Sequence, residues 1–224
     1  YKFKKNEGNI GFRAIQKTNK RCLVINSDLG NIPENLSQIF DEVFSLDRNL
    51  EKISIQKYRF DEKNIKNIIL IKSEDHSLLF PDNYFDLIII DGIKIFEKGE
   101  ISEIKVSEYF KEIQRILDID GCMCVGVKNK RSLKILEDER KNEINNDNYT
   151  QTFSGYDSIF KKLGFVVEPY WVLPSFQKPH YSASINDDIS LKWFLDNFDK
   201  FLFNDTKFAI PRFFLKKINS KIHK

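Results

Sequence analysis

Short apolar runs alternate along the chain with segments whose apolar residues recur at helical spacing. Four of the runs are nearly continuous in apolar residues, as expected for central strands of a sheet that is covered on both faces. The six runs are residues 21–26, 42–46, 67–72, 86–91, 122–127 and 165–173. Because helical segments separate them, the pattern predicts a doubly wound α/β sheet with mostly parallel strands.

The clearest helical segment lies between the fourth and fifth runs. In VSEYFKEIQRIL, residues 106–117, the apolar side chains form one stripe at helical spacing. The stripe consists of Val106, Tyr109, Phe110, Ile113, Ile116 and Leu117. A second helix is predicted over YDSIFKKLGF, residues 156–165, with Gly164 as its C-terminal cap.

The alternation of strands and helices breaks in two regions. Residues 137–148 are polar and rich in asparagine, which favours an exposed loop. After the sixth run, residues 174–188 carry two prolines and several turn formers, so regular structure should stop there. A last helix is predicted over residues 190–203. Residues 207–217 are predicted to form an edge strand, because Pro211 does not suit a central one.

These elements predict one domain over residues 1–224. Its core should cover about residues 21–173, and residues 174–224 should add a C-terminal lid followed by the last helix and strand. The sheet should have seven strands, mostly parallel, with an antiparallel last hairpin.

The composition argues against several classes of protein. Apolar residues make up 41% of the 224 residues, so the chain can bury a core. The net charge of +3 is small and no basic stripe stands out, so nucleic-acid binding is not expected. No apolar run approaches the length of a membrane span and no signal peptide is evident, which predicts a cytoplasmic protein. The chain starts at Tyr1 without a methionine, so a segment of a longer chain stays open, as does a homo-oligomer.

Neither cysteines nor histidines suggest a metal site. Cys22, Cys122 and Cys124 are too few for a disulfide framework, and their spacing fits no zinc pattern. All three lie in apolar runs, which predicts buried, reduced thiols. The three histidines are scattered without acidic residues at ligand spacing, so no metal is expected.

The stretch CLVINSDLGNIPENL, residues 22–36, joins an apolar strand, a turn of small residues and the start of a helix. In an open α/β sheet, ligands bind beyond the carboxyl ends of the strands, where the strand order reverses. Gly30 lies in this turn. Asp47 ends the second run, at a spacing typical of an acid that accepts hydrogen bonds from ribose hydroxyls. Such turns usually contain two or three glycines, and this turn contains one. The turn alone is therefore a weak indication of a cofactor site.

Two further stretches carry a more specific signal. SEDHSLLFPDNYFDLIIIDG, residues 73–92, and YFKEIQRILDIDGCMCVGV, residues 109–127, resemble the class I S-adenosylmethionine-dependent methyltransferases. That family has an acid after strand three, a segment LPFPDNSFDLV entering strand four, and a helix LREIxRVLKPGG before strand five. The resemblance covers about residues 21–173. It implies a Rossmann-like fold and S-adenosylmethionine as the cofactor.

The resemblance also assigns the residues of the first turn. The family's usual acid falls on Val24, and its first two glycines fall on Asn26 and Asp28, so only Gly30 matches. Asn and Asp tolerate left-handed backbone best after glycine, so the turn can keep its shape. Asp28 would add a negative charge near both the carboxylate and the sulfonium of the cofactor, which leaves the sign of its net effect open.

Other positions follow from the same resemblance. Asp47 matches the ribose-binding acid, Glu74 matches the acid at the adenine amino group with Asp75 as a second candidate, and His76 would lie beside the adenine. Asp91 ends the fourth strand, where the methyl group is presented. Each has a structural alternative: Asp47 and Asp91 as helix caps, Glu74 and Asp75 as a solvated turn, and His76 as a loop residue.

The implied function is methyl transfer to a small-molecule or glycan acceptor, as O-methylation. Residues 152–165 and 170–181 are loosely similar to methyltransferases of bacterial surface-polysaccharide gene clusters. Residues 170–181 are predicted to form the acceptor side of the cleft, with His180 as the base for a hydroxyl acceptor and Asp91 as the alternative.

Two other classes of function stay open. A binding or scaffold protein could keep this fold without the chemistry. A nicotinamide dehydrogenase is a weaker alternative, because it would need a richer glycine turn and would not explain the residues at 80–87 and 115–121.

Overall fold

A computed structural model gives the fold of most of the chain. It describes residues 20–73, 78–93, 103–127, 151–174, 179–189, 192–193 and 196. By their contacts, the residues divide into two compact units, Tyr1–Val167 with Val172–His180 and Glu168–Trp171 with Tyr181–Lys224. The expectation of one domain stays a prediction.

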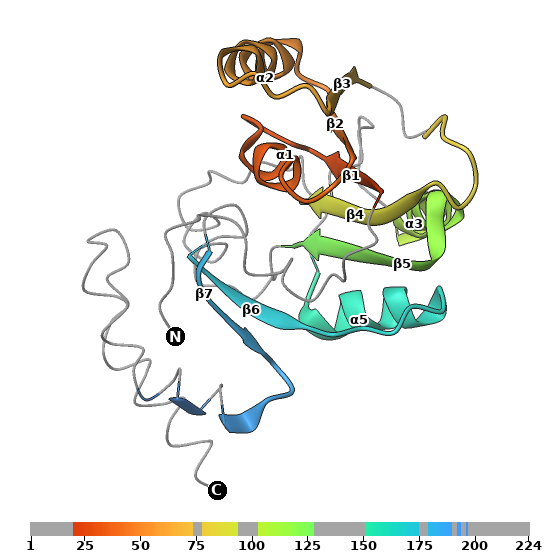
Figure 1. Ribbon diagram of the computed structural model, residues 1–224. Coiled ribbons are helices and arrows are strands. Elements are labelled where there is room, and N and C mark those ends of the chain that lie inside the picture. The colour runs from red at the N-terminus through yellow and green to blue at the C-terminus, as the bar shows by residue number, and fades with distance from the viewer. Residues whose placement is uncertain are drawn as a thin grey trace, which may run out of the picture. The chain divides into compact units, whose positions relative to one another are not determined.

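Five parallel strands form the main sheet of the first unit (Figure 1). They are β1 (Arg21–Ile25), β2 (Glu42–Asp47), β3 (Ile68–Lys72), β4 (Phe85–Asp91) and β5 (Leu117–Gly126). Their order across the sheet is β3-β2-β1-β4-β5, and each neighbouring pair is parallel. The order reverses between β1 and β4. The predicted doubly wound α/β sheet is therefore confirmed for these five strands.

Helices connect the strands as the apolar pattern indicated. They are α1 (Asn31–Leu36), α2 (Leu50–Glu62), α3 (Glu103–Ile116) and α5 (Phe153–Lys162). The helices predicted over residues 106–117 and 156–165 correspond to α3 and α5, with ends shifted by a few residues. Gly164 follows α5 with φ of 85°, the left-handed conformation expected after a helix C terminus.

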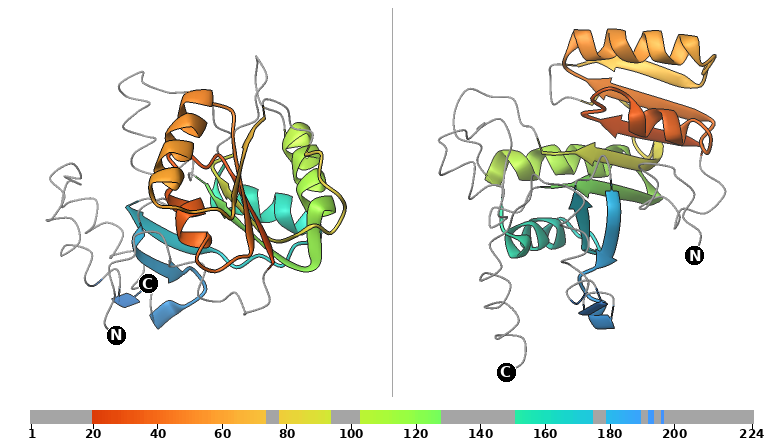
Figure 2. Two further views of the ribbon diagram at one scale, coloured as in Figure 1. Left: turned by 45° about the horizontal axis from the view of Figure 1, so that its top comes forward. Right: turned by 90° about the vertical axis from the view of Figure 1, so that its left-hand side faces the viewer.

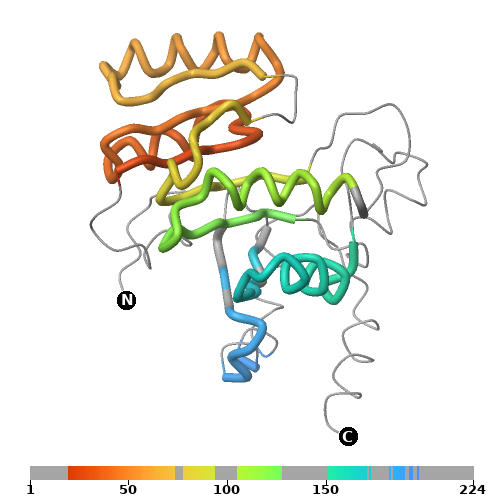
Figure 3. Tube along the Cα trace, turned by 90° about the vertical axis from the view of Figure 1, so that its right-hand side faces the viewer, coloured from red at the N-terminus to blue at the C-terminus, as the bar shows by residue number. Residues whose placement is uncertain are grey.

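An apolar cluster lies on each face of the sheet. One cluster joins β1, β2 and β4 to α3 and α5, where the rings of Phe110 and Phe160 meet edge to face at 4.8 Å. The other joins opposite-facing side chains of the same strands to Ile32 and Leu36 of α1. The left view of Figure 2 shows α1 and α2 on one side of the strands and α3 on the other, and Figure 3 shows α3 running along β4 and β5.

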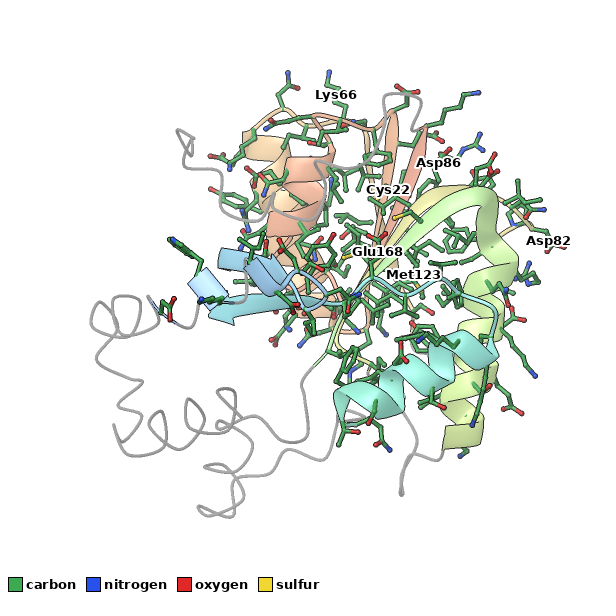
Figure 4. All side chains as sticks on the ribbon, turned by 90° about the horizontal axis from the view of Figure 1, so that it is seen from below. Cys22, Lys66, Asp82, Asp86, Met123 and Glu168 are labelled. Atoms are coloured by element: carbon green, nitrogen blue, oxygen red, sulfur yellow. The ribbon has the colours of Figure 1, made fainter. Side chains whose placement is uncertain are left out.

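One arginine of α3 holds the segment that enters β4. Arg115 donates to the carbonyl oxygens of Leu78 and Phe80, both at 2.9 Å. Its guanidinium also lies 2.6 Å from the carboxylate of Asp82, which Figure 4 labels near α3. Asn83 has φ of 52°, and Asp82 and Asn83 form the turn before β4. The two stretches that resemble methyltransferases, residues 73–92 and 109–127, are therefore hydrogen-bonded to each other just before β4 begins.

The last two strands differ from the sequence prediction. β6 (Tyr170–Pro174) pairs with β7 (Pro179–Ser184) in a separate two-stranded sheet, so a seven-stranded sheet is not confirmed among the described residues. The sixth run, residues 165–173, forms a strand only from Tyr170 onward. Phe165 and Val167 precede this strand and pack against the cluster that includes Phe110 and Phe160. The predicted loop over residues 174–188 is wrong at β7, since a proline is tolerated as the first residue of a strand.

Parts of the C-terminal prediction cannot be compared with the structure. Residues 137–148 and 207–217, predicted as a loop and an edge strand, lie outside the described residues. Of the helix predicted over residues 190–203, residues 192–193 and 196 are described, and they are helical. Within the described part of the chain, no helix is long and apolar enough to cross a membrane.

The cysteines are free thiols, but they differ in exposure. Cys22, labelled in Figure 4, is buried and Cys124 is partly buried, whereas Cys122 is exposed on β5. The prediction of burial is therefore wrong for Cys122, because β5 is an edge strand of the five-stranded sheet. Burial raises the pKa of Cys22 and raises that of Cys124 to about 12, so both stay protonated at neutral pH.

Candidate functional site

The turn that follows β1 alternates between ordinary and left-handed backbone. Asn26, Asp28 and Gly30 have φ values of 59°, 51° and 84°. The sequence predicted that Asn and Asp could take the shape of glycine here, and these angles confirm it. The turn also closes on itself, because the Gly30 N–H donates to the Ser27 carbonyl at 3.0 Å. One glycine therefore suffices for three left-handed positions spaced two residues apart.

A fully buried glutamine of α2 fastens this turn. The Gln56 amide group donates to Ser27 Oγ at 2.9 Å and to the Asp28 carbonyl at 2.7 Å. Its oxygen accepts a hydrogen bond from the Ser45 hydroxyl of β2 at 2.6 Å. A buried amide without partners is costly, so these bonds fix the turn, β2 and α2 together. No motif in the sequence pointed to Gln56, although its position four residues before buried Phe60 was a usable signal.

Gly30 is required for a second reason besides its backbone angle. A Cβ atom at this position would lie 2.7 Å from Cζ of Phe60 and 2.9 Å from Cγ of Gln56. Contacts this short force a neighbour to move, and both neighbours are themselves buried in α2. The glycine therefore allows α2 to pack closely against the start of α1.

Asp47, at the end of β2, holds the turn from the other side. One carboxylate oxygen accepts from the Asp28 N–H at 3.0 Å, and the other accepts from the Asn49 N–H at 2.9 Å. The alternative that Asp47 caps the next helix is wrong, because the Asn49 side chain caps α2 by accepting from Glu51 N–H and Lys52 N–H. A carboxylate oxygen can accept more than one hydrogen bond, so Asp47 keeps capacity for a ligand hydroxyl.

Asn26 connects the turn to the neighbouring strand across the point where the strand order reverses. Its side-chain amide donates to the Gly92 carbonyl, just beyond β4, at 2.8 Å. Gly92 in turn donates its N–H to the Gly126 carbonyl at the end of β5, also at 2.8 Å. Asp91 precedes Gly92 and lines a small pocket together with turn residues that include Asn26 and Asp28. The carboxyl ends of β1 and β4 thus meet at one pocket, and Gly92 joins this edge to the end of β5.

Lys52, in the first turn of α2, brings a positive charge to this site. Its ammonium lies 2.6 Å from the Asp28 carboxylate. The hydrogen bond to Asp28 is the main cause that raises the pKa of Lys52, and partial burial opposes it. The charges of Asp47 and Asp91 raise this pKa further, so the lysine stays charged at neutral pH. No sequence motif pointed to Lys52, because its partner is distant in sequence.

The remaining predicted residues are placed only in part. Glu74, Asp75 and His76 lie outside the described residues. Ser73, the residue just before them, lies beside the site, because its N–H donates to the backbone carbonyl of Asp47 at 3.3 Å. His180 belongs to β7, and its side chain is not described. No group of acidic, histidine or cysteine side chains in the described part could hold a metal ion.

Comparisons with known proteins identify relatives of the fold. No protein-family model and no curated protein matches the chain. The YcgJ protein from Bacillus subtilis is similar in structure with a TM-score of 0.56 at 18% identity, over 82% of this chain and 78% of that one. A SAM-dependent methyltransferase from Thermotoga maritima gives 0.57 at 15%, over 78% and 79%. The (4+2)-cyclase SpnF gives 0.54 at 15%, over 71% and 56%.

These likenesses establish the fold. Similar structures from Leishmania major and Aquifex aeolicus are also described as SAM-dependent methyltransferases, so the chain has the Rossmann-like α/β fold of class I methyltransferases. Because the cyclase shares the fold, the fold does not determine the reaction. The activity has to be argued from the site.

The packing at Gly30 makes a testable prediction about stability. We expect Gly30→Ala to lower the free energy of unfolding by about 2–4 kcal/mol, because it combines a left-handed alanine with overpacking against Phe60. Urea unfolding of both proteins, followed by far-UV circular dichroism, measures the difference.

Gly164→Ala is the matched control for this substitution. Gly164 has φ of 85° but nothing within 4 Å of its missing Cβ, so only the backbone cost of about 1–2 kcal/mol applies. Equal losses in the two variants would show that packing against α2 does not require the glycine.

The amide of Asn26 can be tested in the same assay. Asn26→Gly keeps the left-handed backbone but removes the hydrogen bond to Gly92, so the free energy of unfolding should fall by about 1–2 kcal/mol. Asn64→Gly is the control, because Asn64 is also left-handed, with φ of 53°, and is exposed after α2. A loss no larger than that of the control would contradict a role for the Asn26 amide.

Proposed function

We propose that this chain is an S-adenosylmethionine-dependent methyltransferase. The observation that carries the proposal is the turn of residues 26–30, in which three left-handed residues lie beside the Asp47 carboxylate. This turn lies where the strand order of a methyltransferase-type sheet reverses, the usual place for a ligand in such folds.

The residues of the turn suit such a cofactor. In this proposal, Asp47 binds the ribose hydroxyls with the lone pairs that its two backbone hydrogen bonds leave available. Residues 26–30 receive the methionine part, because their left-handed backbone reproduces the shape of a glycine-rich turn. Glu74 or Asp75, with His76, contacts the adenine, since the chain enters this segment next to Asp47.

The reaction proposed is O-methylation of a small-molecule or glycan acceptor. The bound cofactor supplies an electrophilic methyl group. The contribution of the chain is to align the acceptor hydroxyl with that methyl group and to accept the hydroxyl proton. Asp91 is suited to the second task because it lines the pocket beside the turn. His180 is the other candidate, on the expectation that residues 170–181 form the acceptor side.

A direct measurement of cofactor binding tests the proposal. We expect isothermal titration calorimetry to detect binding of S-adenosylhomocysteine by the unaltered chain. Asp47→Asn should weaken this binding at least about tenfold, because hydrogen bonds to a charged acceptor contribute about 1.5–3 kcal/mol. Asn is preferred to Ala because its side-chain oxygen can still accept one of the two backbone N–H groups that hold the turn.

Asp61→Asn serves as the control for charge loss, since Asp61 is an exposed residue of α2 paired with Lys57. If the unaltered chain binds no S-adenosylhomocysteine, the proposed function fails, and a scaffold role becomes the better account. Equal affinities of Asp47→Asn and Asp61→Asn would remove Asp47 from the site.

The two candidate bases are separated by activity. With an acceptor that supports transfer from radiolabelled S-adenosylmethionine, loss of the base should lower kcat about 100-fold or more and leave the affinity for S-adenosylhomocysteine unchanged. Asp91→Asn and His180→Gln are compared in this assay. Full activity in one variant excludes that residue as the base, and full activity in both excludes base catalysis by either.

A further inference from the structure

We propose that Lys52 is a further residue of the cofactor site, which neutralises Asp28 so that the turn can accept the carboxylate of the ligand. This inference rests on the proposed function, and it assigns a role to a residue that no sequence motif indicated. It also explains how a turn can carry an acid where the related family has a glycine.

The geometry of the pair is fixed from both sides. The Lys52 ammonium lies 2.6 Å from Asp28 Oδ1, a distance expected of a charged hydrogen bond. Lys52 stands in the first turn of α2, which is capped by Asn49 and held to the turn by buried Gln56. The Asp28 backbone is held by its N–H bond to Asp47. The ion pair therefore joins two elements that are already locked in place.

The pair contributes little to folding, which points to a role at the site. The side chains of Lys52 and Asp28 are about one-third exposed, at 32% and 35%. Ion pairs this accessible to water contribute little to stability. The pocket beside the turn is lined by two acids, Asp28 and Asp91. Without a cation these carboxylates would repel an anionic group, and Lys52 is the cation that the structure places against Asp28.

The inference predicts an effect that depends on the ligand. S-adenosylhomocysteine carries a carboxylate, whereas 5′-methylthioadenosine contains the same nucleoside without the amino-acid end. Lys52→Gln leaves Asp28 unpaired, so it should weaken S-adenosylhomocysteine binding about tenfold at low salt and change 5′-methylthioadenosine binding less than about twofold. The loss should shrink as salt is added, because exposed charges are screened.

A double variant distinguishes the effect of the unpaired Asp28 charge from the effect of losing the Lys52 side chain. In Asp28→Asn with Lys52→Gln, the Asp28 charge is removed together with that of Lys52, so affinity for S-adenosylhomocysteine should return to within about threefold of the unaltered chain. Lys57→Gln is the matched control: Lys57 lies on the same helix and pairs with Asp61 at 3.0 Å in solvent. Thermal unfolding should show that both single lysine variants remain folded with similar stability.

Calorimetry of these four proteins with the two ligands decides the inference. Unchanged binding of S-adenosylhomocysteine by Lys52→Gln overturns it, while binding by the unaltered chain still supports the proposed function. A double variant as weak as Lys52→Gln also overturns it, because the lysine would then act without Asp28. Equal losses for both ligands contradict a role toward the carboxylate. If the unaltered chain binds neither ligand, both the inference and the proposed function fail.

Discussion

The hydrogen bonds of buried Gln56 are the interaction on which the rest of the site depends. This one amide bonds to Ser27 and Asp28 in the turn and to Ser45 in β2, and all of these contacts are at 2.9 Å or less. A fully buried amide keeps its partners because each unsatisfied group would cost free energy without compensation from water. The bonds therefore place α2, and with it Lys52 and Asn49, against the turn.

That constraint accounts for the unusual composition of the turn. Three positions need left-handed backbone, but only Gly30 also faces the packed side chains of Phe60 and Gln56, so only there is a Cβ excluded. At the other two positions the chain uses side chains: Asn26 bonds to Gly92, and Asp28 pairs with Lys52. Asn26 and Asp28 are thus compatible with an ordered left-handed turn, and they make contacts that a glycine cannot make.

Part of each stretch that carries the resemblance in sequence serves the fold, through the contacts of Arg115 with residues 78–82. Arg115 binds the carbonyl groups of Leu78 and Phe80 and the carboxylate of Asp82, all before β4 begins. In a parallel sheet the amino-terminal ends of the strands lie at the edge opposite to their carboxyl ends, where the turn of residues 26–30 lies. The contacts of Arg115 therefore support the architecture at the edge of the sheet opposite to the turn.

Local patterns in the sequence determined the five strands, helices α3 and α5, and the left-handed tolerance of Asn26 and Asp28. These features follow from apolar periodicity and backbone preference within a few residues. Tertiary structure alone decided the roles of Gln56 and Lys52. Their partners lie in another element and meet them only when α2 packs over the end of β1. Tertiary structure also decided that β6 pairs with β7, because an apolar run shows that a strand forms but not which strand it pairs with.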